Sequence, residues 1–360
     1  MGAATRVAVT GGGSAGHAVP NLPIIEDLLR QGCDVVYFGS ADGPERQIVE
    51  PLGITYVSIA VERLRRYRAW SNLLIPFRVV SGVLQSLIRL RQYRPTVLFS
   101  KGGFVSVPPV IAAWLLRIPV VIHESDLTPG LANRIAGRFA KTICVALPAE
   151  WARYPGWFAK KCITTGIPLR PGFQEADAAL ADQQFDLERD RPLLFVFGGS
   201  AGARSLNLAL RAALPALLNR YQIVHICGRG HLDMSLADQS GYLQLEYLSS
   251  GIEHLMKRAD IILCRAGMTS LLELLALKQP AILVPLSRAA SRGDQIDNAT
   301  LMVEKKLCIQ VEDDGLSAET LVEAVGLYEQ QVDAMRKQMA SVQLLNDATA
   351  ITAQLFTIRD

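Results

Sequence analysis

Two glycine-rich segments and a histidine beside the first are the residues of this chain whose types and spacing suggest chemistry. A short β-branched run leads into TGGGSAGH at residues 10–17, and a second run leads into FGGSAGAR at residues 197–204. A third glycine-rich segment, the pair Gly102 and Gly103, follows a run that ends at Ser100. Glycine-rich turns between a strand and a helix bring backbone N–H groups and a helix N-terminus to an anion. The segments therefore predict phosphate binding, although similar glycines also occur in tight turns that bind no ligand.

His17 closes the first glycine segment at the predicted start of a helix. The positive end of a helix dipole lowers the pKa of an imidazole and keeps it neutral, which a general base requires. A histidine that only caps the helix or packs is the alternative. Neither long glycine segment is a P-loop, because no Gly-Lys-Ser or Gly-Lys-Thr follows, and the G-x-G-x-x-G spacing is only partly met.

Composition excludes several classes of protein. With 360 residues the chain is long enough for two α/β domains, and a formal net charge of +3 argues against a general nucleic-acid binder. The six cysteines show no metal-ligand spacing, which predicts reduced thiols in a cytoplasmic protein. The longest apolar stretch, residues 107–122, is interrupted by prolines and by Arg117, so no transmembrane helix is expected.

Both halves of the chain alternate short β-branched runs with amphipathic segments of helix length, which predicts two doubly wound, Rossmann-like parallel sheets of the α/β class. The predicted strands are residues 6–10, 34–38, 96–99, 120–122 and 142–145, and then residues 193–197, 222–226, 243–245, 261–263 and 281–284. Ligands of such sheets bind beyond the carboxyl ends of the strands, so two of these domains are expected to face a cleft.

The expected domain boundary lies near residue 165. Residues 1–164 form the first domain and residues 165–340 the second, with residues 165–172 as the crossing point. A charged, alanine-rich stretch at residues 174–191 precedes the second run of strands. The last helix, residues 341–360, is expected to pack back on the first domain.

Residues 62–94 form a basic segment with a single acid, Glu62. Eight arginines alternate there with apolar and aromatic residues such as Trp70 and Phe77. Such a surface suits anionic lipid headgroups, which predicts docking on a membrane around residues 63–77. A helix packed on the sheet with a solvated arginine face is the alternative for the second part of the segment.

Several motifs together resemble a known family. They are GGGSAGHAVPNLPI, SKGGFVSVPPVIAA, HESDLTPGLANRIA, TGIPLRP, FVFGGSAGARSLN, CRAGMTSLLELLAL and DQIDNA. In order and spacing they resemble the bacterial glycosyltransferases of peptidoglycan synthesis that add N-acetylglucosamine to lipid I, over nearly the whole chain. The resemblance implies a GT-B fold, UDP-N-acetylglucosamine as donor, undecaprenyl-pyrophosphoryl-N-acetylmuramyl-pentapeptide as acceptor, inversion at the anomeric carbon, and lipid II as product.

The resemblance also implies roles for individual residues. His17 is similar to the base that deprotonates the 4-hydroxyl of the acceptor. The implied substrate-binding residues are Ser14, Ala15 and Gly16 in the first loop, Asp126 beside the donor sugar, Arg170 and Ser200 at the UDP, Leu248 at the uracil, Met268, Thr269, Ser270, Leu271, Leu272 and Glu273 at the nucleotide, and Gln295 and Asn298 at the sugar hydroxyls. Glu273 is suited to the ribose, because a carboxylate accepts hydrogen bonds from two hydroxyls at once.

Two motifs depart from the family pattern. The usual HEQN reads HESD, which places Asp126 where the family has an asparagine, and the first loop reads GGGSAGH rather than GGTGGH. A carboxylate beside a diphosphate sugar adds repulsion and removes a hydrogen-bond donor. The chain is therefore either the standard enzyme or a divergent relative.

The expected chemistry needs no cofactor. With no D-x-D-like pair in the expected place, we predict that helix N-termini and arginine stabilise the departing diphosphate without an obligatory metal. The expected location is the cytoplasmic face of the membrane, as a peripheral protein. The alternatives are a GT-B enzyme that uses another lipid or a soluble small molecule, a UDP-sugar epimerase, and a non-catalytic nucleotide-sugar-binding protein.

Overall fold

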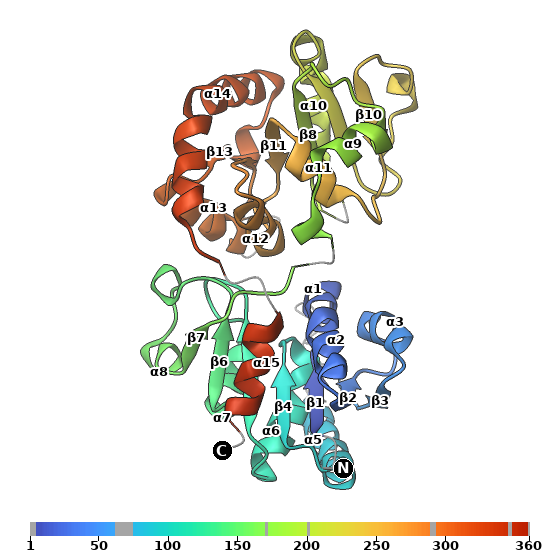
Figure 1. The fold of residues 1–360 in the computed structure, drawn as a ribbon, viewed down its shortest axis with the longest axis vertical. Helices are drawn as coiled ribbons and strands as arrows, with labels where there is room; N and C mark the ends of the chain where they lie inside the picture. The colour runs from blue at the N-terminus through green and yellow to red at the C-terminus, as the bar shows by residue number, and fades with distance from the viewer. Residues whose placement is uncertain are drawn as a thin grey trace. The chain divides into compact units, whose positions relative to one another are not determined.

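The chain forms two compact units of α/β structure (Figure 1). The computed structural model describes residues 5–61, 75–169, 172–199, 202–288, 293–344 and 348–358. The first unit combines Met1–Arg170 with Leu345–Asp360, and the second is Pro171–Leu344.

The first unit contains a seven-stranded parallel sheet in the order β3-β2-β1-β4-β5-β6-β7. Its strands are β1 (Arg6–Thr10), β2 (Asp34–Gly39), β3 (Thr55–Ser58), β4 (Val97–Ser100), β5 (Val120–Glu124), β6 (Thr142–Val145) and β7 (Cys162–Thr164). Its helices are α1 (Ala15–Ala18), α2 (Leu22–Arg30), α3 (Pro44–Val49), α5 (Ile75–Tyr93), α6 (Val107–Leu115), α7 (Leu131–Phe139), α8 (Gly156–Ala159) and α15 (Ala348–Thr357). Four 3₁₀ turns join them: η1 (Val19–Asn21), η2 (Glu50–Leu52), η3 (Phe104–Ser106) and η4 (Ala149–Trp151).

Alternation along the strands gives this sheet two apolar faces. Val7 and Val9 belong to a core that includes residues of α2 and α15, whereas Ala8 belongs to the core that includes residues of α5, α6 and α7. All three side chains are fully buried. A parallel sheet covered by helices on both faces needs apolar residues at nearly every strand position, which is why β-branched runs predicted it.

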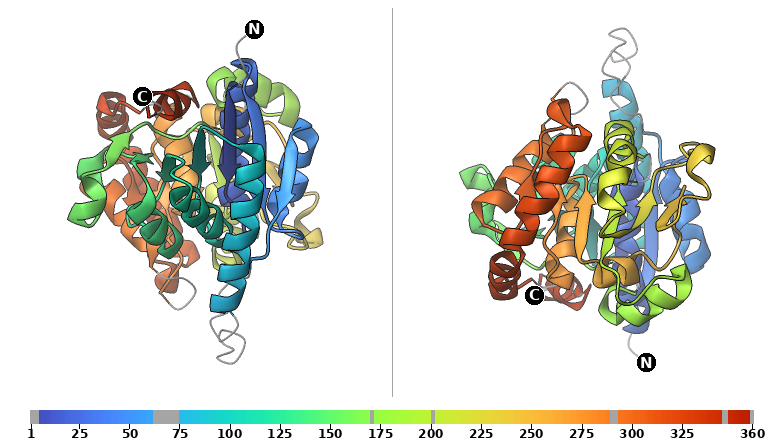
Figure 2. Two further views of the ribbon diagram at one scale, coloured as in Figure 1. Left: turned by 90° about the horizontal axis from the view of Figure 1, so that it is seen from below. Right: turned by 90° about the horizontal axis from the view of Figure 1, so that it is seen from above.

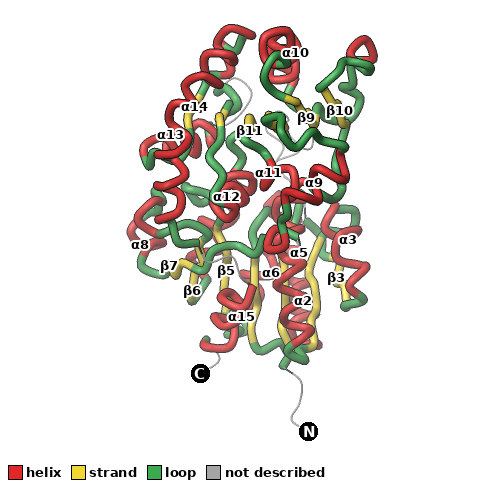
Figure 3. Tube along the Cα trace, turned by 45° about the horizontal axis from the view of Figure 1, so that its top comes forward, coloured by secondary structure: helices red, strands yellow, loops and turns green. Residues whose placement is uncertain are grey.

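The second unit repeats this architecture with a six-stranded parallel sheet in the order β10-β9-β8-β11-β12-β13. In Figure 3 its strands β9, β10 and β11 are labelled among the helices of the same unit. Its strands are β8 (Leu193–Phe197), β9 (Gln222–Ile226), β10 (Tyr242–Leu245), β11 (Ile261–Cys264), β12 (Ile282–Leu283) and β13 (Ile309–Gln310). Its helices are α9 (Ala178–Phe185), α10 (Arg204–Leu217), α11 (Ile252–Arg258), α12 (Met268–Leu277), α13 (Asp294–Glu304) and α14 (Ala318–Ser341), with 3₁₀ turns η5 (Phe173–Glu175), η6 (Met234–Leu236) and η7 (Asp313–Gly315). The prediction of two doubly wound parallel sheets is confirmed.

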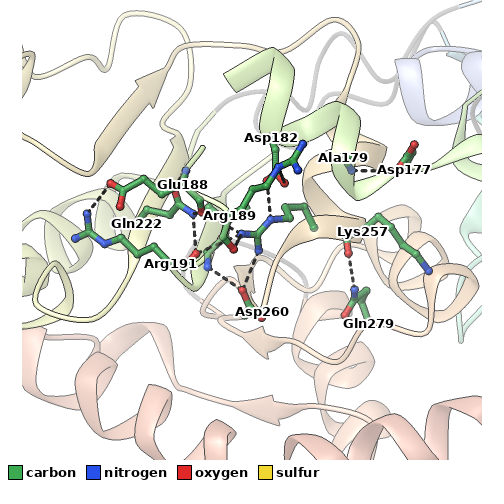
Figure 4. Close-up of polar contacts among 12 residues, drawn as sticks. Asp177, Ala179, Asp182, Glu188, Arg189, Arg191, Gln222, Lys257, Asp260 and Gln279 are labelled. Atoms are coloured by element: carbon green, nitrogen blue, oxygen red, sulfur yellow. Dashed lines mark hydrogen bonds and ion pairs between the residues drawn. The ribbon is translucent and has the colours of Figure 1, made fainter. Parts of the chain in front are cut away.

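The charged stretch before β8 is anchored to the second unit by ion pairs and hydrogen bonds. Arg258 at the end of α11 pairs with Asp182 of α9 at 2.7 Å and with Asp260 at 3.1 Å. The Gln222 side chain donates to the backbone carbonyls of Glu188 at 2.6 Å and Arg191 at 2.7 Å. Figure 4 shows Asp182, Glu188, Arg191, Gln222 and Asp260 close to one another. The stretch is therefore a folded part of the second unit.

The last helix returns to the first unit, where α15 lies beside α2 (Figure 1). The hydroxyl of Thr352 donates to the buried carboxylate of Asp27 at 2.6 Å, and Lys141 donates to the carbonyl of Ile358 at 3.1 Å. Ile351 and Leu355 of the same helix are fully buried in the core below α2. Polar and apolar contacts together hold the chain end on the sheet.

The described helices include none that could cross a membrane, because none combines sufficient length with sufficient apolar character.

Candidate functional site

The first glycine loop follows β1 and carries His17 in the short helix α1. Ser14 and Gly16 are exposed, and His17 is half-buried with no hydrogen-bonding partner for its buried Nδ1 among the described side chains and backbone. Burial, and next the ammonium group of Lys101, lower the pKa of His17 to about 4. The imidazole is therefore neutral at physiological pH. Burial and a neighbouring cation account for this neutral state.

The pair Gly102 and Gly103 packs against this loop. The backbone N–H of Gly12 donates to the carbonyl of Gly102 at 3.2 Å. A Cβ atom on Gly103 would lie 2.0 Å from the carbonyl oxygen of Gly12 and 3.1 Å from Cδ2 of His17. Gly102 and Gly103 also have φ of +98° and +83°. Glycine is required here so that the loop after β4 can pass directly beneath the loop after β1.

A buried charge cluster lies under the loop that carries Asp126. The carboxylate of Glu124 accepts hydrogen bonds from the backbone N–H of Asp126 at 2.9 Å and of Gly130 at 3.2 Å, and from the amide of Asn133 at 3.0 Å. Lys101, which is almost fully buried, donates from Nζ to the hydroxyl of Ser125 at 2.6 Å. These contacts hold residues 125–130 in place, with Asp126 exposed at the surface.

The charges in this cluster oppose one another. Burial, and next the carboxylate of Asp126, raise the pKa of Glu124 to about 7, and Lys101 acts in the opposite direction. Burial lowers the pKa of Lys101, whereas Glu124 and Asp126 raise it. Sequence reasoning singled out Asp126 alone, and it missed both Lys101 and Glu124, although both stand within the motifs SKGG and HESD.

In the second unit, the glycine loop between β8 and α10 packs closely on the end of β9. A Cβ atom on Gly202, which has φ of +75°, would lie 2.4 Å from the carbonyl oxygen of Cys227. Arg265, at the end of β11, pairs with Asp313 at 2.8 Å and donates to the hydroxyl of Ser205 at 2.8 Å. Arg265 was not predicted as a site residue, yet it fixes the first turn of the helix that follows the loop.

The predicted nucleotide residues lie in and around α12. Met268, Leu271, Leu272 and Glu273 are buried, and Glu273 retains only 1% exposure. Ser270 is half-buried and Thr269 is exposed in the first turn of α12.

Two predicted sugar-contacting amides lie in α13, and both form internal hydrogen bonds. The amide of Asn298 donates to the carbonyl of Ala266 at 3.0 Å, and the side-chain oxygen of Gln295 accepts from the N–H of Leu286 at 3.1 Å. These bonds tie α13 to the segments that directly follow β11 and β12. Leu248 is half-buried in the turn after β10.

The predicted residues are thus divided between the two units. His17, Ser14, Ala15, Gly16 and Asp126 lie in the first unit, and the residues from Leu248 to Asn298 lie in the second. Arg170 and Ser200 lie outside the described residues. Among the described side chains, no group of three or more His, Cys, Asp or Glu residues could hold a metal ion.

Comparison with family models decides the classification. The glycosyltransferase family 28 N-terminal domain matches residues 7–145, and the glycosyltransferase family 28 C-terminal domain matches residues 193–355. The chain belongs to glycosyltransferase family 28. The two matched regions fall in the two structural units, apart from the last residues of the C-terminal match, which include most of α15.

Named relatives of this family cover nearly the full length of the chain. It is 44% identical over 352 residues, 97% of this chain and 98% of the relative, to the UDP-N-acetylglucosamine–N-acetylmuramyl-(pentapeptide) pyrophosphoryl-undecaprenol N-acetylglucosamine transferase of Shouchella clausii (strain KSM-K16). It is 46% identical over 294 residues, 82% of this chain and 83% of the relative, to the Bacillus cereus (strain ATCC 10987 / NRS 248) protein with that name and the numeral 2. The resemblance seen in the sequence motifs is confirmed.

A solved structure shows the same fold. The crystal structure of Acinetobacter baumannii MurG matches with a TM-score of 0.79 at 23% sequence identity, covering 98% of this chain and 99% of that chain. Together with the two parallel sheets, this likeness confirms the predicted GT-B class of fold.

Proposed function

We propose that this chain transfers N-acetylglucosamine from UDP-N-acetylglucosamine to the 4-hydroxyl of the N-acetylmuramyl group of lipid I, giving lipid II for peptidoglycan synthesis. The observation that carries the proposal is the 44% identity to a named transferase of this activity over 97% of the chain. Family models matching both units support it, because donor and acceptor sites are both expected in such an enzyme.

His17 supplies the base in this proposal. As the acceptor oxygen attacks the anomeric carbon, its proton passes to the imidazole, the bond to UDP breaks, and the diphosphate leaves with the electron pair. A pKa of about 4 keeps His17 unprotonated and ready to accept that proton at neutral pH. Attack opposite the leaving group inverts the configuration of the sugar.

The second unit supplies the donor site in this proposal. Glu273 holds the ribose hydroxyls from α12, and the turn containing Leu248 contacts the uracil. The N-termini of α10 and α12 carry positive partial charge suited to a diphosphate. Arg265 supports this site indirectly, since it holds the N-terminal turn of α10 through Ser205. Arg170 and Ser200 complete the proposed UDP contacts.

The proposed acceptor carries a lipid chain, and the first unit offers a surface suited to a membrane. Four apolar side chains on α5 are largely exposed: Phe77 at 73%, Val80 at 58%, Leu84 at 56% and Ile88 at 57%. Their spacing of three and four residues places them along one side of the helix. Figure 2 shows α5 in cyan beside α6 on one face of the first unit.

Cations on the same helix strengthen this surface. Arg78, Arg89 and Arg91 are exposed on α5. Each near-surface cation contributes about 1 kcal/mol of attraction to an anionic leaflet. We therefore propose peripheral docking on the cytoplasmic face through α5. Of the predicted docking stretch around residues 63–77, residues 63–74 lie outside the described residues.

Incubation of the purified chain with radiolabelled UDP-N-acetylglucosamine and a short-chain lipid I analogue tests the function. The expected product is the analogue carrying one labelled sugar, with one UDP released for each transfer. A labelled UDP-sugar epimer, formed without acceptor, would identify an epimerase instead. Absence of transfer to the analogue, with transfer to another acceptor, would assign a different glycosyltransferase.

A further inference from the structure

A buried carboxylate occupies the first glycine loop. Glu45, in the first turn of α3, has no exposed surface. Its Oε2 accepts the backbone N–H of Gly13 at 3.0 Å, and its Oε1 accepts the backbone N–H of Ser40 at 3.0 Å and the hydroxyl of the same serine. Concave backbone segments of this kind bind anions through their N–H groups. Here a side chain of the same chain already fills that role.

The position of this carboxylate requires glycine at residues 12 and 43. A Cβ atom on Gly12 would lie 2.5 Å from Cδ of Glu45 and 2.8 Å from both of its oxygens, and one on Gly43 would lie 2.3 Å from Oε1. Any larger residue at either position would meet the carboxyl group. Close backbone approach, which sequence reasoning ascribed to a bound phosphate, is here an approach to Glu45.

Glu45 keeps its negative charge. Burial raises its pKa, but the hydrogen bonds from Ser40 and Gly13 together bring the pKa below the ordinary value. It forms no ion pair among the described residues, so hydrogen bonds from Ser40, Gly13 and its own backbone N–H balance the charge. Burial, and to a smaller extent the charge of Glu45, raise the pKa of the phenols of Tyr37 and Tyr56.

The loop that Glu45 holds is in contact with His17. Gly12 and Gly13 contact the carboxylate on one side, and the carbonyl of Gly12 meets Gly103 on the other, where Gly103 lies against the imidazole. Displacement of the loop would therefore change the packing around His17, and with it the burial that keeps this histidine neutral.

We propose that Glu45 is a positioning residue: it serves as the permanent anion of the first glycine loop and fixes the place of His17. The N–H of Gly13 is consequently no contact for a substrate phosphate. The inference rests on the proposed function for the role of His17, but the contact itself is independent of activity.

The pKa of His17 provides the direct test. The full chain labelled with ¹⁵N-histidine has five histidines, so the His17 signal is assigned by its loss in His17→Ala and titrated by NMR. In Glu45→Ala, and to a lesser extent in Glu45→Gln, we expect the pKa of His17 to rise by about one unit or more toward the ordinary value of about 6.5, because the loop no longer shields it. Glu45→Asp should lie between Glu45→Gln and the parent. Glu50→Gln, on an exposed carboxylate close by in the chain, is the matched control and should change nothing.

Kinetics with the short-chain acceptor give the second readout. A misplaced base lowers kcat by roughly 10- to 100-fold, with KM for both substrates nearly unchanged and partial rescue in Glu45→Asp. Gly12→Ala should act like Glu45→Gln, since the added methyl group displaces the carboxylate. The double variant Gly12→Ala with Glu45→Ala should be no worse than Glu45→Ala alone, because the clash is then gone.

An unchanged pKa of His17 in folded Glu45→Gln would overturn the proposal. So would an unchanged kcat with the short-chain acceptor in that variant, because His17 would then be in place without the carboxylate. Failure of the parent chain to transfer sugar contradicts the proposed function instead, and it leaves the NMR result to decide the role of Glu45.

Discussion

His17 lies where the carboxyl end of β1 meets the loop after β4, and its proposed role as base is tested by removing the imidazole. His17→Ala should lower kcat by roughly 10² to 10⁴, the usual contribution of a general base, because no other group replaces the proton acceptor. UDP affinity, measured by calorimetry, should stay the same, since the proposed nucleotide residues other than Arg170 lie in the other unit. The exposed His231 provides the control His231→Ala. A kcat for His17→Ala close to that of the parent would refute the assignment.

The cluster of Glu124, Lys101 and Asp126 predicts that activity falls at acidic pH. Replacing Asp126 and replacing Lys101 should shift this fall in opposite directions. The ionised Glu124 accepts three hydrogen bonds from residues 126–133, so protonation below its pKa of about 7 weakens the loop. The like charge of Asp126 raises this pKa and the cation Lys101 lowers it, while the phenol of Tyr154 and the thiol of Cys162 also face Glu124.

Asp126→Asn should therefore move the acidic limb of the kcat/KM profile to lower pH, and Lys101→Met should move it to higher pH. Lys101→Met also raises the pKa of His17, because a neighbouring cation is lost, which shifts the limb in the same upward direction. Glu150→Gln, at an exposed carboxylate of the first unit, is the control. Shifts of the same sign in the two test variants would show that the cluster does not control activity.

At the scale of elements, the sequence predicted the central strands well and the edges poorly. β1, β6, β8 and β9 have the predicted bounds, because residues buried on both faces leave continuous β-branched runs. Edge strands β3 and β7 are only partly buried, and β13 has two residues, so none of them shows the fully buried run of a central strand, although the edge strand β10 was predicted to within one residue.

The same distinction explains which site residues could be foreseen. His17 stands on a recognisable loop. The roles of Glu45, Lys101 and Glu124 follow instead from the strand order β2-β1-β4-β5, which brings together the carboxyl ends of strands that are far apart in the sequence. Their partners are mainly backbone N–H groups, together with the hydroxyls of Ser40 and Ser125 and the amide of Asn133. No sequence motif specifies a contact with a backbone N–H group.

Helix α5 carries the prediction that belongs to the element scale. Replacing Leu84 and Ile88 with aspartate puts two charges into the exposed apolar stripe. This should reduce sedimentation with phosphatidylglycerol vesicles and slow turnover of a long-chain lipid acceptor. Turnover of a short, water-soluble acceptor should be unaffected. Met234→Asp, at a side chain of the second unit that is 75% exposed, is the control.

Salt separates the two contributions to docking. The attraction of Arg89 and Arg91 is screened beyond a Debye length of about 8 Å at physiological ionic strength, whereas the apolar contribution remains. In high salt, membrane binding by the parent should therefore weaken without vanishing. Under the same conditions, binding by the double variant should vanish. Normal sedimentation of the double variant, or equal loss with both acceptors, would place the docking surface elsewhere.

At the scale of the whole molecule, the division into two units predicts that nucleotide binding is separable from the rest of the chain. The second unit is continuous in sequence, and its apolar core joins β8, β9, β11, α10 and α14 without residues from the first unit. A fragment of residues 164–344, which keeps the proposed UDP contact Arg170, should therefore fold and bind UDP in calorimetry with nearly the affinity of the full chain. Glu273→Gln should weaken UDP binding by about tenfold or more, because hydrogen bonds to a charged group contribute about 1.5–3 kcal/mol. The same substitution should hardly affect 2′,3′-dideoxy-UDP, which lacks the ribose hydroxyls assigned to Glu273. A folded fragment with no detectable UDP binding would show that residues before 164 complete the nucleotide site, and equal losses for both ligands would remove Glu273 from the ribose.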